Sequence, residues 1–318
     1  MIIPDVKEKW TGSVNEVILG ATREQGGTRD QVIRVGGAKT IPLMSFEGPV
    51  GNRPVIAVDV LDVAPTEWPA PLMEAVKDVA RDPAAWAKKA IGEWGADLVC
   101  IKLDGLNPDG ANRSADQAVE TVLKVKEAVG CPLIVWGCGD HQKDNEAMPK
   151  ISQALKGERA LLGCAEEKNY KTITAVCLAD GHGLITLSPL DINIQKQVNI
   201  LVSDMGFPLD RIVIFPTTGA LGYGMEYTYS IQERGRIAAL TGDKMMAMPV
   251  ICDTGYESWR AKEAKSAEAA EWGPQEKRGP IWETVTATTL LQAGVDIIRT
   301  RSPQATAAIR RAIERFYG

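Results

Sequence analysis

The chain has 318 residues, 45% hydrophobic and 24% charged, a composition typical of a folded protein large enough for one barrel of roughly 250 residues and an extension. Its net charge of -5 argues against nucleic acid as a partner, because a phosphate backbone is bound by an excess of Lys and Arg. With no long apolar stretch for a membrane span and no signal peptide pattern, we expect a cytoplasmic protein without membrane contact.

Residues 1–53 precede the regular pattern of the rest of the chain. Two short β-prone runs, Val14 to Leu19 and Gln31 to Val35, are separated by a Gly-rich connection at residues 20–27. This spacing predicts a β-hairpin. A hairpin placed before a barrel often closes the bottom of the barrel or contacts another subunit. We therefore expect an N-terminal extension over 1–53 and a second domain over 54–318.

Eight apolar runs, each followed by a polar cluster and a helix-like stretch, occupy residues 54–318. This repeat predicts an α/β fold, a TIM (β/α)₈ barrel with an N-terminal β-hairpin extension. In such barrels the loops after the strands carry function, whereas the opposite end serves stability. The runs are Val55 to Asp62, Leu98 to Asp104, Leu133 to Cys138, Leu161 to Ala165, Leu184 to Leu190, Ile212 to Thr218, Pro249 to Thr254 and Ile297 to Ser302.

The expected helices have recognisable starts. Asp82 and Ser302 each stand before a Pro, and Ser114 with Gln117 has the spacing of a capping box. The last long connection runs from Thr254 to a helix expected near Pro280, with a helix-prone middle at residues 261–270. Long loops at the functional end of a barrel are usually lids or partner contacts.

The six cysteines are scattered and include no C-x-x-C pair, so we expect reduced and mostly buried thiols. An iron–sulfur cluster held by this chain alone would need four converging thiolates, which this spacing does not favour. The cysteines are Cys100, Cys131, Cys138, Cys164, Cys177 and Cys252.

Polar residues at the ends of the runs should gather at one mouth of the barrel. Lys102 and Asp104 share a face of their strand, which favours an ion pair over a Schiff-base amine. The other members are Asp59, Asp62, Asp140, His141, Glu166, Ser188, Asp191, Thr217, Thr218, Asp253, Arg299 and Arg301.

The two histidines differ in position. The segment Asp180-Gly181-His182-Gly183 begins like the D-x-H-x-x-G motif that ligates cobalt, but it lacks the final Gly and precedes a strand. A turn between helix and strand explains it better. His141 follows a strand and lies at the functional end, but one His does not make a metal site.

The loop after the sixth run is the most ligand-like segment of the chain. Residues 217–227 place three glycines among small and aromatic residues. In such a loop the backbone amides can lie against a ligand that is flat or carries amide groups at its edge. A Gly-rich connector without function is the alternative.

Four runs of the chain resemble one known family. They are Pro54 to Asp62, Trp136 to Asp140, Phe215 to Gly224 and Arg299 to Pro303. These runs resemble the small subunit of the corrinoid iron–sulfur protein, whose archaeal counterpart is the delta subunit of the acetyl-CoA decarbonylase/synthase complex. The resemblance extends over essentially the whole chain, including the hairpin.

The resemblance implies a heterodimer. The large subunit would carry the iron–sulfur cluster and the cobalamin-binding domain, and the small-subunit barrel mouth would cover the corrinoid. The dimer would carry a methyl group from methyltetrahydrofolate, through a separate methyltransferase, to acetyl-CoA synthase in the anaerobic Wood–Ljungdahl pathway of carbon fixation. The chain would then be a methyl-carrier subunit, not a stand-alone enzyme, without catalytic or metal-ligating residues of its own. From their positions, the residues expected at the corrinoid are Asp104, Asn107, Asp140, His141, Ser188, Thr217, Thr218, Gly219 and Tyr223.

Two alternatives remain. The barrel resembles, more distantly, the pterin-binding barrels of methyltetrahydrofolate methyltransferases and dihydropteroate synthases, in which Asp and Asn at strand ends hold the pterin. The chain would then act directly on methyltetrahydrofolate. An aldolase that uses Lys102 is the third possibility. The candidate pterin ligands are Asp104, Asn107, Asp140, Asp191 and Asn193.

Overall fold

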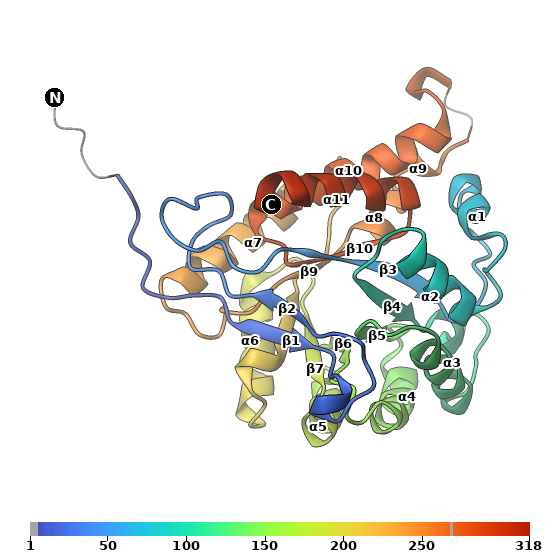
Figure 1. Ribbon diagram of the computed structural model, residues 1–318, viewed down its shortest axis with the longest axis horizontal. Helices are drawn as coiled ribbons and strands as arrows, with labels where there is room; N and C mark the ends of the chain where they lie inside the picture. Colours follow the sequence, from blue (N-terminus) through green and yellow to red (C-terminus); the bar gives the residue numbers. More distant parts are fainter. Residues whose placement is uncertain (1–5, 268–269) are drawn as a thin grey trace.

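A computed structural model describes residues 6–267 and 270–318 and contains the expected barrel (Figure 1). Eight parallel strands form one sheet in the order β8-β7-β6-β5-β4-β3-β10-β9. Each strand lies in one of the eight predicted runs, apart from Gly183, which opens β7 one residue early. The strands are β3 (Val55–Leu61), β4 (Leu98–Lys102), β5 (Leu133–Trp136), β6 (Leu161–Ala165), β7 (Gly183–Leu187), β8 (Ile212–Phe215), β9 (Ile251–Asp253) and β10 (Ile297–Thr300).

The barrel is nearly closed between its first and last strands in the sheet order. The amide of Ile214 in β8 donates a hydrogen bond of 2.9 Å to the carbonyl of Pro249, just before β9. Every residue of β3 is buried, because one face points into the barrel and the other meets the surrounding helices. The apolar runs of the sequence therefore reflect strands that are covered on both faces.

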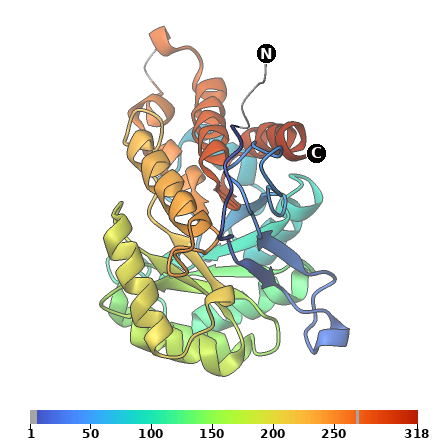
Figure 2. The same cartoon turned by 90° about the vertical axis from the view of Figure 1, so that its left-hand side faces the viewer.

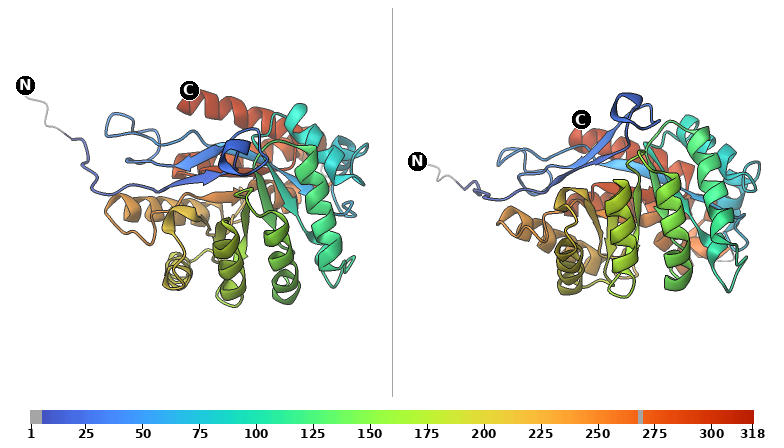
Figure 3. Two further views of the ribbon diagram at one scale, coloured as in Figure 1. Left: turned by 60° about the horizontal axis from the view of Figure 1, so that its bottom comes forward. Right: turned by 90° about the horizontal axis from the view of Figure 1, so that it is seen from below.

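Helices surround the strands and cover their outer faces (Figure 3). Asp82, Ser114 and Ser302 cap the helices that begin at Pro83, Ala115 and Pro303, as predicted, because each side chain accepts at least one backbone N–H of the first turn. Short 3₁₀ segments are η1 (Arg23–Gln25), η2 (Asp104–Leu106), η3 (Leu209–Arg211) and η4 (Ala270–Trp272). The helices are α1 (Ala70–Val76), α2 (Pro83–Gly92), α3 (Ala115–Ala128), α4 (His141–Ala154), α5 (Tyr170–Asp180), α6 (Ile192–Asp204), α7 (Met225–Leu240), α8 (Thr254–Arg260), α9 (Lys262–Lys265), α10 (Gln275–Ala293) and α11 (Pro303–Tyr317).

The predicted hairpin is present and closes the bottom of the barrel. Its strands β1 (Glu16–Leu19) and β2 (Ile33–Gly36) pair antiparallel and lie across one end of the barrel strands (Figure 2). Val17, Leu19 and Val35 belong to the same buried cluster as the side chains that fill the barrel. A buried ion pair of 2.8 Å between Arg29 and Glu158 also holds the extension to the barrel. A domain boundary at residues 53–54 stays a prediction.

The long connection after β9 differs from the expectation. Helix α10 begins at Gln275 and not near Pro280, because Pro280 is accommodated inside the helix. Arg278 organises the preceding segment by donating to the backbone carbonyls of Glu263, Ser266 and Gly273. Residues 268 and 269 of the helix-prone stretch, and residues 1–5 at the N-terminus, lie outside the described residues.

The cysteines are free thiols, as expected, and all but Cys138 are buried. His182 is fully buried. Its Nδ1 accepts the amide N–H of Ala160, and its Nε2 lies 2.9 Å from the carbonyl oxygen of Ser152. It therefore joins a helix end to a strand start, as the turn interpretation predicted. No helix in the described part of the chain combines the length and apolar character that a bilayer span requires.

Candidate functional site

A cavity of about 930 Å³ opens at the mouth of the barrel, where the strands end. Its walls come from the loops after β3 and β4, from the ends of β7 and β8, from α8 and from the residue after β10. Helices α1 and α9 lie at this same end of the molecule (Figure 1). The position and size are those expected of a ligand or cofactor site in a barrel.

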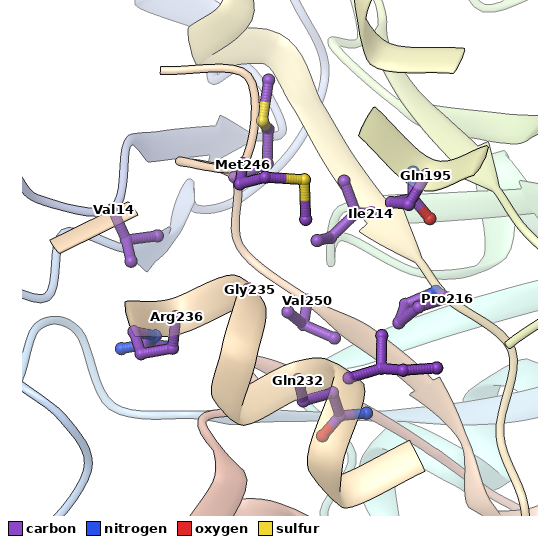
Figure 4. A pocket seen from close by; sticks show the side chains of 11 residues that line it. Val14, Gln195, Ile214, Pro216, Gln232, Gly235, Arg236, Met246 and Val250 are labelled. Carbon is purple, nitrogen blue, oxygen red and sulfur yellow. The ribbon is translucent and has the colours of Figure 1, made fainter. Parts of the chain in front are cut away.

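A second cavity lies away from the mouth, between α6, α7 and the strands β8 and β9 (Figure 4). Its volume is about 10 Å³, close to the space that one water molecule needs. Gln195 and Gln232 line it, and their side-chain oxygens have no hydrogen-bond partner among the described residues. This cavity is too small for a substrate or cofactor.

The floor of the mouth cavity is aromatic and rests on buried charges. The rings of Trp136 and Phe215 meet edge to face with centroids 4.8 Å apart. The guanidinium of Arg299 lies 4.0 Å from the centroid of the Trp136 ring. Arg299 is fully buried and pairs with Asp59 and with Asp253, each at 2.8 Å. Burial nevertheless raises the pKa of Asp253, whose carboxylate also caps α8.

Arg301 forms the most highly organised part of the cavity wall. Its guanidinium carbon lies 5.0 Å from the centroid of the Trp68 ring and 4.9 Å from that of Tyr256. Its Nε donates to Asp59 at 3.1 Å. The side chain is only 6% exposed. Cation–π contacts with two rings and one anchored nitrogen hold the guanidinium in one orientation.

The carboxylate of Glu283 in α10 holds the backbone of Arg301 and Ser302 at the cavity wall. Its carboxylate accepts the amides of Arg301 and Ser302 at 2.8 and 3.2 Å and the indole N–H of Trp259 at 2.6 Å. Burial raises the pKa of Glu283 to about 7, although these three donors favour the ionised form. Glu283 thus fixes the start of α11 against α8.

The charged side chains around the cavity balance in sign. Positive groups are Lys102, Arg260, Lys265 and Arg301. Negative groups are Glu67, Asp104, Asp253 and Glu257. This balance favours a ligand that is neutral overall and polar at its edge over a polyanion such as a nucleotide.

Three of the residues predicted from the sequence line the cavity: Asp104, Asn107 and Thr217. Asp104 pairs with Lys102 at 3.4 Å, which confirms the ion pair expected there. Lys102 also donates to the carbonyl of Gly137. The side chain of Thr217 donates to the carbonyl of Ser188 from a left-handed backbone conformation (φ 62°).

The other six predicted residues lie beside the cavity and not in its wall. Asp140 caps α4, and His141 lies 3.5 Å from Glu166. Ser188 is fully buried, and its hydroxyl has no hydrogen-bond partner among the described residues. Contact between these residues and a ligand stays a prediction.

Thr218, Gly219 and Tyr223 shape the loop after β8. The hydroxyl of Thr218 accepts the amide of Asp253 at 2.9 Å. A side chain at Gly219 would collide with the backbone of Gly224, so the turn requires glycine there. The hydroxyl of Tyr223 donates to Glu263 at 2.9 Å and accepts the amide of Lys262 at 3.0 Å, which ties this loop to α9.

The candidate pterin ligands do not gather in the cavity. The carboxylate of Asp191 is used to cap α6, where it accepts the amides of Asn193 and Ile194. Together with the capping role of Asp140, this leaves only Asp104 and Asn107 of that set in the cavity wall. Among the described residues, no three His, Cys, Asp or Glu side chains are placed to hold a metal ion.

Sequence reasoning did not single out Trp68, Trp136, Tyr256 or Glu283. Trp136 lies near the end of the predicted run Leu133 to Cys138, which was a usable signal, and is the last residue of β5. Trp68 and Tyr256 lie in connections that are far apart in the sequence, and Glu283 lies in the middle of a helix. Nothing in their local patterns marks them as neighbours of Arg301.

Comparison with known proteins gives a consistent result. The family described as CO dehydrogenase/acetyl-CoA synthase delta subunit matches residues 16–269. A relative from Archaeoglobus fulgidus, acetyl-CoA decarbonylase/synthase complex subunit delta, is 37% identical over 98% of this chain and 70% of its own length. The subunit of the same name from Methanopyrus kandleri is 38% identical over 95% of this chain and 75% of its own length.

Solved structures show the same fold at low identity. A dihydropteroate synthase from Coxiella burnetii, in complex with pteroic acid, has a TM-score of 0.58 at 13% identity and covers 95% of this chain and 100% of its own. The dihydropteroate synthase of Xanthomonas albilineans with 4-aminobenzoic acid has a TM-score of 0.55 at 14% identity and covers 83% and 92%. At a sequence identity this low, the similarity supports a shared barrel fold and nothing about function.

Proposed function

Because the chain belongs to the CO dehydrogenase/acetyl-CoA synthase delta subunit family, we propose that it is the small subunit of a heterodimeric corrinoid iron–sulfur methyl carrier. The large subunit would hold the cobalamin and the iron–sulfur cluster. The dimer would receive a methyl group from methyltetrahydrofolate through a methyltransferase and deliver it to acetyl-CoA synthase. The relatives carry the name of a complex subunit, which supports a role with partner chains.

The observation that carries this proposal is the cavity at the barrel mouth. It is open to the outside, has an aromatic floor, and is lined by equal numbers of positive and negative side chains. Such a surface suits a flat, neutral ring with amide groups at its edge, which is the chemistry of a corrinoid. The terminal N–H groups of Arg301, which have no hydrogen-bond partner within the described residues, offer donors to that edge.

When bound, a corrinoid supplies a cobalt centre that accepts and releases a methyl group. The residues of this chain would cover that centre from one side. Trp136, Phe215 and Leu187 would exclude water from the covered face, because apolar and aromatic side chains replace solvent there. Movement of the partner domain that holds the cofactor would then open and close access. The ion pairs of Asp59 beneath the floor keep this surface rigid.

The proposal is tested by purifying the chain alone and together with its cobalamin-binding partner subunit. We expect a corrinoid absorption spectrum and methyl transfer only when both chains are present. Failure of the two chains to associate, or methyl transfer by the partner without this chain, would contradict the proposal.

A titration of the isolated chain with methyltetrahydrofolate separates this role from that of a pterin-binding enzyme. The carrier role predicts no saturable binding, because two of the candidate pterin ligands are engaged in capping helices. Binding followed by turnover in the single chain would favour the pterin-binding enzyme.

A further inference from the structure

Arg301 has hydrogen-bonding capacity that the described part of the chain does not use. Of the side-chain nitrogens of Arg301, only Nε has a hydrogen-bond partner among the described residues, namely Asp59. The terminal nitrogens Nη1 and Nη2 belong to a side chain that lines the mouth cavity and is 94% covered. Neither terminal nitrogen is among the fully buried unpaired atoms, so both remain accessible, and a group that enters the cavity can accept hydrogen bonds from them.

The orientation of Arg301 is set before any ligand arrives. Three separate elements hold it: Trp68 before α1, Tyr256 in α8, and Glu283 in α10, which accepts the backbone amide of Arg301. Arranging donors in advance reduces the ordering cost of binding. The side chain therefore has the features of a built recognition site, which a mobile surface arginine does not have.

The surroundings indicate which acceptor fits. Asp59 already compensates the positive charge of Arg301, and the cavity as a whole carries four positive and four negative side chains. A free carboxylate or phosphate would add a net negative charge to this balanced set. Neutral carbonyl oxygens can accept hydrogen bonds from the terminal nitrogens without doing so.

We propose that Arg301 is the residue that fixes the corrinoid at the barrel mouth, by donating from Nη1 and Nη2 to the carbonyl oxygens of its carboxamide side chains. This inference rests on the proposed function and adds the specific contact. Trp68, Tyr256 and Glu283 act as positioning residues for that donor. A lysine cannot replace it, because an ammonium lacks the planar fork of donors and does not stack on aromatic rings as a guanidinium does.

The test measures the association of the full chain with its cobalamin-binding partner subunit in two forms, loaded with hydroxocobalamin and free of corrinoid. Retention of corrinoid by the complex after gel filtration is read from the visible spectrum. For Arg301→Lys we expect the dissociation constant for the loaded partner to rise about 10-fold to 100-fold, the range of a lost charge-assisted hydrogen bond. Association with the corrinoid-free partner should not change.

Two further variants keep the test independent of folding. Tyr256→Leu removes one of the two cation–π contacts of Arg301 at a partly exposed position and should weaken association with the loaded partner about three- to tenfold. Arg34→Lys alters an exposed ion pair on the hairpin, at the opposite end of the barrel, and should leave association unchanged.

Equal association of Arg301→Lys and wild type with the loaded partner would overturn the inference while leaving the proposed function intact. Equal weakening with both forms of the partner would also overturn it, since Arg301 would then contact protein and not corrinoid. If the wild type binds neither form, the proposed function fails, and this inference fails with it.

Discussion

Replacing Asp59 by Asn removes the negative charge at the centre of the barrel while keeping the shape of the side chain. Asp59 is fully buried and pairs with Arg299 at 2.8 Å and with Arg301 at 3.1 Å. In the variant, Arg301 would have no carboxylate partner and Arg299 would keep only Asp253. The substitution therefore leaves buried positive charge without compensation.

Loss of one member of a buried ion pair lowers the free energy of unfolding by about 3 to 5 kcal/mol, because the remaining charge stays removed from water without a partner that compensates it. The expected fall in the melting temperature follows from the unfolding entropy of about 2.1 cal/mol/K for each of the 318 residues. This entropy converts the loss into a fall of roughly 4 to 7 °C. Equilibrium unfolding in urea, followed by tryptophan fluorescence and by circular dichroism, measures the free-energy change directly.

Glu16→Gln provides the matched control. Glu16 also pairs with an arginine, Arg34, but both side chains are at least 40% exposed, so water screens the pair. Its loss should cost less than about 1 kcal/mol. If Asp59→Asn is no more destabilising than Glu16→Gln, the buried charges do not support the floor of the mouth, and the reasoning about the site is wrong.

Two other predictions concern the support of the cavity wall. Burial raises the pKa of Glu283 from 4.5 to about 7, so between these pH values the folded state keeps a proton that the unfolded state has lost. As the pH rises from about 4.5 to above 7, the free energy of unfolding of the wild type should therefore fall by about 3 kcal/mol relative to that of Glu283→Gln. Urea unfolding at several pH values checks this, and parallel pH profiles would contradict it. Gly279→Ala would place a methyl carbon 2.3 Å from the ring of Trp259 and should destabilise the fold by about 1 to 3 kcal/mol, whereas Gly92→Ala meets no atom within 4 Å and should be neutral or slightly stabilising. Thermal unfolding compares the two variants. Equal melting temperatures would show that α10 and Trp259 can move apart without loss of stability.

The repeating features of this barrel are local, and the sequence predicted them well. All residues of Val55–Leu61 are apolar except one, which is the pattern of a strand covered on both faces. The caps at Asp82 and Ser302 were likewise readable, because a capping side chain bonds only two or three residues away. The start of α10 was misplaced at Pro280, because proline is most common at the first position of a helix, whereas here it lies inside the helix.

The site was predictable only in part. The mouth location followed from the fold, and Asp104, Asn107 and Thr217 do line the cavity. Asp140 was placed at the correct end of its strand, but its carboxylate caps a helix. A carboxylate just after a strand can serve a cap or a ligand, and the spacing alone does not distinguish the two uses.

The sequence by itself determined the eight strands, the hairpin and the end of the barrel where a site must lie, because each depends on periodicity or on contacts between near neighbours. The tertiary structure alone decided that Trp68, Tyr256 and Glu283 converge on Arg301. Trp68 comes from the connection after β3, whereas Tyr256 and Glu283 come from two helices of the connection after β9, and the two connections meet only when the sheet curves into a barrel. The orientation of a buried guanidinium depends on such long-range contacts, so no local pattern in the sequence encodes it.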